Sequence, residues 1–186
     1  MLICGLGNFG NQYNDTRHNV GFHVLDLIAN KYQVNFLKKD KFKAQVVAMQ
    51  IANIEVMLIK PLTYMNLSGQ AVQAIANYHQ IKSENIIVIH DDIELALGKI
   101  KAKIGGGNAG HNGLKSLDQA MGKNYIRVRV GVDRPNHDDV AAYVLGKFTQ
   151  AEKSIIEFKY HAIIDALPLL VNQEIAKFND IFAVNK

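Results

Sequence analysis

The segment Asn85-Ile86-Ile87-Val88-Ile89-His90 decides the fold, because it is a short apolar run rich in β-branched residues. Such a run is typical of a strand that is buried on both faces near the middle of a sheet. Asp91 and Asp92 follow directly, so the predicted strand delivers polar side chains at its carboxyl end. The rest of the chain must supply neighbouring strands and the helices that cover them.

Several other segments predict the neighbouring strands. They are Met1–Leu6, Ala44–Gln50, Ile54–Lys60, Lys99–Ile104 and Ile126–Val130. The short link Ile51-Ala52-Asn53 predicts a hairpin, and Pro61 ends the strand that follows it. Lys99–Ile104 and Ile126–Val130 alternate between polar and apolar residues, as expected for strands with one face in water.

Helical spacing of apolar residues predicts the covering helices. They are Val20–Tyr32, Ser68–His79, Asn112–Met121, Asp138–Leu145 and the chain from Gln150 onward, with Pro168 expected in the first turn of a second helix there. Strands interleaved with helices, together with a hairpin, predict an α/β fold. We expect an α/β/α sandwich with a twisted, mixed β-sheet. No Pro/Gly/Ser linker divides the chain, so residues 1–186 are expected to form a single domain.

Composition narrows the class of protein. The chain has 186 residues, 48% apolar and 20% charged, which is ordinary for a globular protein. No apolar run approaches the roughly 18 residues that span a membrane, and the N-terminus lacks the features of a signal peptide. Cys4 is alone and lies in an apolar strand, so it is expected in the core of a cytoplasmic protein. The net charge of +4 permits a polyanionic partner without requiring one.

The glycine motif Gly5-Leu6-Gly7-Asn8-Phe9-Gly10 matches the pattern G-x-G-x-x-G of dinucleotide-binding folds. That site needs a helix directly after the glycines and an acidic residue about 20 positions later. Here 11–15 is a poor helix start, and Asp26 lies within a helical pattern. A dinucleotide cofactor is therefore not expected. The glycines form a tight turn, either for purely structural reasons or to project Asn8 into a site.

Polar residues gather where predicted strands end, which is where sites form in open α/β sheets. They are Asn8, Arg17-His18-Asn19, Met65-Asn66, His90-Asp91-Asp92 and His111-Asn112. No G-x-S-x-G motif and no H-E-x-x-H metal motif is present. A neutral histidine oriented by a carboxylate can activate water, and asparagine amides can donate to an oxyanion. Taken singly these residues are ordinary helix caps or surface groups, but together they suit direct hydrolysis of an activated ester.

Two predicted strands carry basic rows. Lys99, Lys101 and Lys103 share one face of their strand by its period of two, and so do Arg127 and Arg129. Two such rows could follow a phosphate backbone. The alternative is that these strands simply point lysine and arginine at water.

Five blocks of sequence resemble the bacterial peptidyl-tRNA hydrolase family in order and spacing. They are Gly5–Gly10 with Tyr13 and Thr16–Gly21, Lys60–Gly69, His90–Asp92, Gly105–Lys115 and Arg127–Gly131. Three features depart from the family: Phe9 stands where proline is usual, Asn108-Ala109 stands in the glycine-rich loop where small residues or histidine are common, and the segment Gly122–Tyr125 is shorter than expected.

The resemblance implies a monomeric α/β enzyme that cleaves the ester between a peptide and tRNA, with no metal or organic cofactor. It implies that His18 is the general base and that Asp91, rather than Asp92, orients it. It assigns Asn8 to the catalytic group, and the expected substrate-binding residues are Asn66, Asn112, Met65, Tyr13, Tyr64, His111 and Asn19. Lys103 and Arg129 match a clamp for the 5′-phosphate region beside the tRNA acceptor end. A non-catalytic RNA-binding protein of the same fold is the alternative.

Overall fold

The computed structural model describes residues 1–136 and 139–183, which build one seven-stranded sheet in the order β2-β3-β4-β1-β5-β7-β6. The strands are β1 (Leu2–Gly5), β2 (Leu37–Lys39), β3 (Ala44–Ile51), β4 (Ile54–Pro61), β5 (Ile86–Asp92), β6 (Ile100–Ile104) and β7 (Ile126–Gly131). Strands β4, β1, β5 and β7 run parallel, while β2, β3 and β6 pair antiparallel with their neighbours. The sheet is therefore mixed, as predicted.

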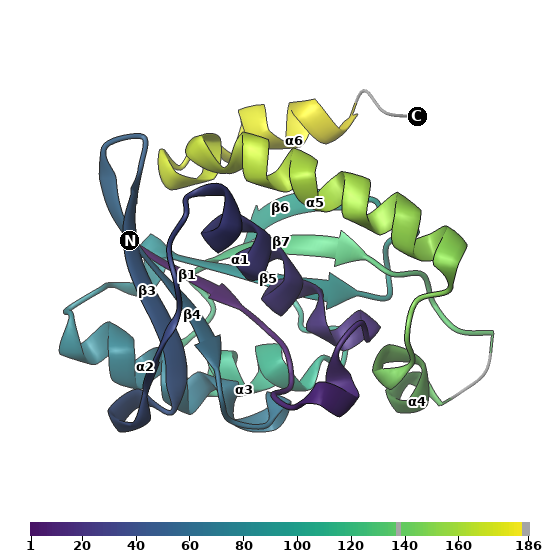
Figure 1. Cartoon of the computed structure of the whole chain (residues 1–186), viewed down its shortest axis with the longest axis horizontal. Helices are drawn as coiled ribbons and strands as arrows, with labels where there is room; N and C mark the ends of the chain where they lie inside the picture. Colours follow the sequence, from purple (N-terminus) through teal and green to yellow (C-terminus); the bar gives the residue numbers. More distant parts are fainter. Residues whose placement is uncertain (137–138, 184–186) are drawn as a thin grey trace.

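Helices cover both faces of this sheet (Figure 1). One face packs against α1 (Val20–Lys31), α5 (Gln150–Val171) and α6 (Ile175–Ala183). The other packs against α2 (Ser68–Tyr78) and α3 (Asn112–Met121). The short helix α4 (Val140–Leu145) lies at the end of the sheet where the parallel strands finish. The predicted α/β architecture is confirmed.

Strand β5 is central, as its apolar sequence predicts. It lies between β1 and β7, and all of its residues are buried. Ile87 and Ile89 belong to the core beneath α1 and α5, whereas Ile86 and Val88 belong to the core above α2 and α3. The strand continues through Asp92, so both acidic residues are held by the sheet itself.

Several details differ from the sequence-based expectation. Strand β2 was not predicted, because its exposed residues at the sheet edge carry no burial pattern. The hairpin turn contains only Ala52 and Asn53, whose φ values of 49° and 63° fit the tight turns that join twisted strands. Helix α4 begins at Val140, and Asp138 lies outside the described residues.

Pro168 does not start a new helix; it lies inside α5, three residues before the helix ends at Val171. A proline there removes only the hydrogen bond to the Ile164 carbonyl. Leu167 and Leu170 are fully buried on either side of it, so packing holds the helix together.

The first turn of α1 lies unusually close to β1 and β5, and this places the preceding segment, which contains His18. A Cβ at Gly21 would lie 2.3 Å from the Leu6 amide nitrogen and 2.4 Å from the Ile89 carbonyl oxygen. Only glycine allows this approach, because those atoms are backbone and cannot rotate away.

We expect Gly21→Ala to lower the free energy of unfolding by about 1–3 kcal/mol, because the added methyl forces α1 off the sheet. Urea denaturation followed by circular dichroism measures this. Gly107→Ala is the matched control, since a Cβ there meets no atom within 4 Å. Equal unfolding midpoints for the two variants would contradict the close-packing argument.

Within the described residues, no helix is both long and apolar enough to cross a membrane.

Candidate active site

A cavity of about 330 Å³ opens where β5 ends and α3 begins. The parallel strands β1, β4 and β5 all finish at this edge, so the loops after them meet there. Among the residues that line the cavity are His18, Asp91, His111, Asn112, Val140 and Val144.

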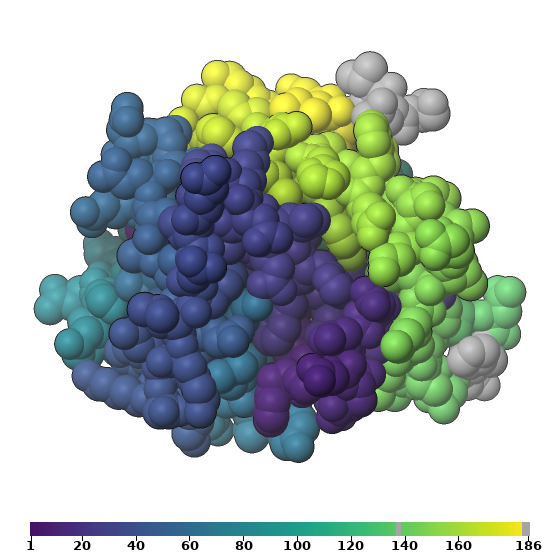
Figure 2. All heavy atoms as spheres, viewed as in Figure 1, coloured from purple at the N-terminus to yellow at the C-terminus, as the bar shows by residue number. Residues whose placement is uncertain are grey.

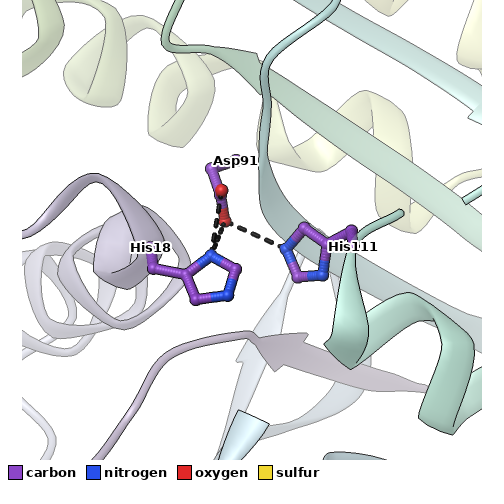
Figure 3. A group of neighbouring side chains, drawn as sticks. All are labelled: His18, Asp91 and His111. Atoms are coloured by element: carbon purple, nitrogen blue, oxygen red, sulfur yellow. Dashed lines mark hydrogen bonds and ion pairs between the residues drawn. The ribbon is translucent and has the colours of Figure 1, made fainter. Parts of the chain in front are cut away.

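His18 and His111 both hydrogen-bond to Asp91 (Figure 3). His18 Nδ1 lies 2.9 Å and 3.0 Å from the two carboxylate oxygens. His111 Nε2 lies 3.0 Å from Asp91 Oδ1, the oxygen that is 2.9 Å from His18. His18 comes from the turn before α1, Asp91 from β5 and His111 from the start of α3, so three segments distant in sequence meet at one carboxylate.

The hydrogen bonds fix the positions of the protons. His111 Nδ1 accepts from the amides of Gly113 and Leu114 at 3.1 Å and 3.3 Å, which caps α3. The proton of its neutral ring therefore sits on Nε2 and is donated to Asp91. His18 likewise donates from Nδ1, because a carboxylate only accepts. The neutral His18 ring thus keeps a lone pair on Nε2.

Each of His18 and Asp91 favours the charged form of the other. Burial opposes a charge on His18, but the attraction and hydrogen bond of Asp91 outweigh it, and the pKa of His18 is raised above 6.5. Burial also opposes a charge on Asp91, yet His18 and His111 outweigh it and hold the pKa of that carboxyl well below its usual range. Asp91 is therefore ionised at neutral pH, and it stabilises a protonated His18.

Asn8 is buried and is held by hydrogen bonds to two neighbouring segments. Its Oδ1 accepts from the Met65 amide at 3.0 Å, which leaves Nδ2 as the free donor end of the side chain. Asn19 holds the backbone of Asn8: its Oδ1 accepts from the Asn8 amide at 2.8 Å, and its Nδ2 donates to the Asn8 carbonyl at 2.9 Å. Asn19 is therefore a buried support behind Asn8, and the prediction that it contacts substrate does not match this geometry.

Of the other predicted substrate-binding residues, His111 and Asn112 line the cavity, whereas Asn66, Met65, Tyr13 and Tyr64 are not among its lining residues. Asn66 and Asn112 are exposed, and Met65 is buried beneath them. Tyr64 is exposed and its ring packs against Phe9, with centroids 5.3 Å apart. Tyr13 is half-buried; its carbonyl accepts from the Thr16 hydroxyl.

A second cavity of about 330 Å³ lies beside the first, and both Lys103 and Arg129 line it. Arg129 Nε donates to Asp92 at 2.6 Å. Arg127 also lines this cavity, but it is fully buried and bonds to Asp118 on α3 and to the Gly107 carbonyl. The prediction that Arg127 belongs to a solvent-facing basic row is wrong, because α3 and the glycine-rich loop cover it.

Comparison with known proteins decides the family. A family model described as peptidyl-tRNA hydrolase matches residues 2–186. The peptidyl-tRNA hydrolase of Rickettsia bellii strain RML369-C is 49% identical over 96% of this chain and 97% of that protein. The peptidyl-tRNA hydrolase of Rickettsia canadensis is 46% identical over 97% of this chain and 98% of that protein. The crystal structure of Acinetobacter baumannii peptidyl-tRNA hydrolase superimposes with a TM-score of 0.94 at 36% identity, covering 98% of this chain and 94% of that one.

This chain belongs to the peptidyl-tRNA hydrolase family. As a member of that family it is a hydrolase. The resemblance drawn from its five sequence blocks is thereby confirmed.

Two residues near the site of this peptidyl-tRNA hydrolase family member were not assigned a role from the sequence. Arg17 is buried and donates to both carboxylate oxygens of Glu152 at the start of α5, at 2.9 Å and 3.0 Å. It thus ties the turn that carries His18 to α5, and Figure 2 shows the purple N-terminal segment lying against the green chain of α4 and α5. The capping-box pattern Thr149-x-x-Glu152 was visible in the sequence, but its long-range partner was not.

His90 is the second such residue. Its ring is buried edge-on against His111, with centroids 5.3 Å apart, and Nδ1 lies 2.7 Å from the Asp91 carbonyl. Burial and the neighbouring His111 lower the pKa of His90 to about 3, so this ring is neutral.

His18, Asp91 and His111 also place three potential metal ligands within 4.8 Å of one another. However, each imidazole points an N–H at the shared carboxylate, and the second nitrogen of His111 caps α3. The hydrogen bonds therefore engage both ring nitrogens of His111 and Nδ1 of His18, which leaves His18 Nε2 as the one free imidazole nitrogen of this group. This arrangement favours a site for proton transfer over a metal site.

Proposed function

We propose that this chain hydrolyses the ester bond between peptide and tRNA in peptidyl-tRNA, releasing free tRNA and peptide. The observation that carries the proposal is the hydrogen bond of 2.9 Å between His18 Nδ1 and Asp91, which leaves His18 Nε2 free to accept a proton. The names of its relatives support the same substrate.

His18 acts as the general base. Its Nε2 takes a proton from water while the water oxygen attacks the ester carbonyl carbon. Asp91 stabilises the imidazolium that forms, and His111 holds Asp91 in place through its own hydrogen bond. The tetrahedral intermediate then breaks its bond to the ribose oxygen, and the proton on His18 returns to that oxygen through water.

Asparagine side chains are proposed to stabilise the developing oxyanion and to hold the peptide. Asn8 is the best-placed donor, because the Met65 amide fixes its Oδ1 and orients Nδ2. Asn66 is an exposed second donor. Asn112, Met65, Tyr13 and Tyr64 line the path of the peptide and the acceptor end.

The test is release of tRNA from an N-acetylated aminoacyl-tRNA, with EDTA present. Rapid hydrolysis by the purified chain supports the proposal and its independence from a metal. A folded chain that binds tRNA without cleaving it would instead support a non-catalytic RNA-binding protein. Light scattering of the same sample tests the expected monomer, and fractionation of cells tests the expected cytoplasmic location.

The pH profile should follow His18. Because the pKa of His18 is raised above 6.5, we expect kcat/KM to rise with pH and to reach half its maximum above pH 6.5. The rate falls on the acid side because protonated His18 cannot accept a proton from water. Initial rates between pH 5.5 and 8.5 measure this, and a flat profile over that range would rule out His18 as the base.

Lys103 and Arg129 are proposed to contact the 5′-phosphate region of the tRNA. We expect Lys103→Ala and Arg129→Ala each to raise KM about tenfold, because each removes a charge-assisted hydrogen bond. Each should also reduce the slope of log KM against log salt by about one. Lys177→Ala, which removes an exposed lysine on α6, should change neither quantity. Unchanged KM and salt slope in both clamp variants would show that the clamp lies elsewhere.

A further inference from the structure

The cavity proposed to receive the tRNA phosphate contains acidic as well as basic groups. Asp92 and Glu94 line it together with Lys103, Arg127 and Arg129. A carboxylate in such a place repels a phosphate, so its presence requires an explanation.

Most of the positive charge in this cavity is already balanced. Arg127 is paired with Asp118 at 2.7 Å, and Arg129 with Asp92 at 2.6 Å. Glu94 in turn is paired with Arg134. Among the described residues that line the cavity, Lys103 is the one lysine or arginine that forms no ion pair.

Asp92 is built into the sheet and cannot move away from an incoming anion. It is the last residue of β5, it is 8% exposed, and its Oδ1 accepts from the Glu94 amide at 2.9 Å. Its other oxygen takes the Nε–H of Arg129 and so holds the guanidinium. Both carboxylate oxygens of Asp92 are therefore hydrogen-bonded, one to the Glu94 amide in the turn and one to Arg129 of the proposed clamp.

We propose that Asp92 is a specificity-determining residue that restrains the affinity of this cavity for the tRNA phosphate group. It competes with the phosphate for Arg129 and orients the remaining guanidinium N–H groups toward it. The cavity then binds a phosphate group in one position more tightly than it binds negative charge in general. This inference rests on the proposed phosphate clamp.

The consequence is a gain of affinity when the charge is removed. In Asp92→Asn the amide oxygen can still accept from Glu94, while the NH₂ group faces Arg129 Nε–H and releases it. Deacylated tRNA with a 5′-phosphate should then bind about fivefold more tightly, as expected for the loss of one opposing charge near the surface. The slope of log Kd against log salt should steepen by about one.

Filter binding of deacylated tRNA, with and without its 5′-phosphate, tests the proposal. Asp92→Asn should tighten binding of the phosphorylated tRNA and leave the dephosphorylated tRNA within twofold of wild type. Glu94→Gln is the matched control, since it removes a charge from the same cavity without touching Arg129; its effect should be smaller. A structural defect would weaken binding, so tighter binding cannot come from damage to the fold.

Weaker or unchanged binding by a folded Asp92→Asn protein would overturn the proposal, as would equal tightening for both forms of tRNA. The outcome of Arg129→Ala separates this failure from failure of the clamp itself. If Arg129→Ala weakens binding while Asp92→Asn does not tighten it, only the role of Asp92 is wrong. If neither variant changes binding, the clamp and the role of Asp92 fail together, while hydrolysis of the ester remains testable by its own assay.

Discussion

His18→Ala is expected to lower kcat by about 10²–10⁴-fold while leaving the Kd for deacylated tRNA close to that of the wild type. The reason is that His18 Nε2 is the proposed acceptor of the water proton, and alanine cannot replace it. Binding should persist because Lys103 and Arg129 lie in the neighbouring cavity, which His18 does not line.

Single-turnover release of tRNA from N-acetylated aminoacyl-tRNA measures the chemical step directly. His79→Ala is the matched control, because His79 follows α2 and packs against Phe42 and Tyr78. It should stay within twofold of the wild type. Loss of less than tenfold in His18→Ala would show that another group activates the water.

Asp91→Asn should be almost as damaging, with kcat reduced by about 10²–10⁴-fold although the shape of the side chain is kept. Asp91 accepts hydrogen bonds from two histidines at once. His18 Nδ1 lies near both carboxylate oxygens and His111 Nε2 near only one of them, so in either orientation the NH₂ group of asparagine opposes the His18 N–H, and in one orientation it opposes the His111 N–H as well. If His18 changes tautomer, the lone pair moves to Nδ1, away from the substrate. If His111 changes, the cap of α3 is lost.

The pH profile of Asp91→Asn provides a second readout. The carboxylate is what raises the pKa of His18 against the effect of burial. Without it burial prevails, so the acid limb of the remaining activity should move to lower pH. An acid limb that stays in place would contradict the coupling of these two residues. Asp165→Asn, on the exposed face of α5, should leave both the rate and the profile unchanged.

The sequence predicted the main elements of the fold because each is defined by a local pattern. The apolar run of β5 marks a strand buried on both faces, and α3 has the bounds that its helical spacing predicts. Periodicity of two or of 3.6 residues is a property of the chain itself, so it is visible without knowledge of neighbours. The edge strand β2 has no such pattern, and it went unpredicted.

The candidate site shows the same division. The family resemblance assigned Asp91, rather than Asp92, as the partner of His18, and His18 hydrogen-bonds to Asp91 in the structure. The sequence could not predict that Asp92 holds Arg129 instead, since that depends on the pairing of β5 with β7. Nor could it predict that His111 shares Asp91, because the start of α3 is brought there by packing.

The sequence by itself thus determined the α/β class, the strand ends at which polar residues gather and the family. The tertiary structure alone decided which of those residues are accessible. Arg127 and Arg129 lie on the same face of β7 by its period of two. Even so, α3 covers Arg127 and leaves Arg129 at the edge of a cavity. Asn8 and Asn19 are the same residue type, yet the side-chain amide of Asn19 is hydrogen-bonded through both its oxygen and its nitrogen to the backbone of Asn8. Burial depends on which distant element covers a position, and no local pattern carries that information.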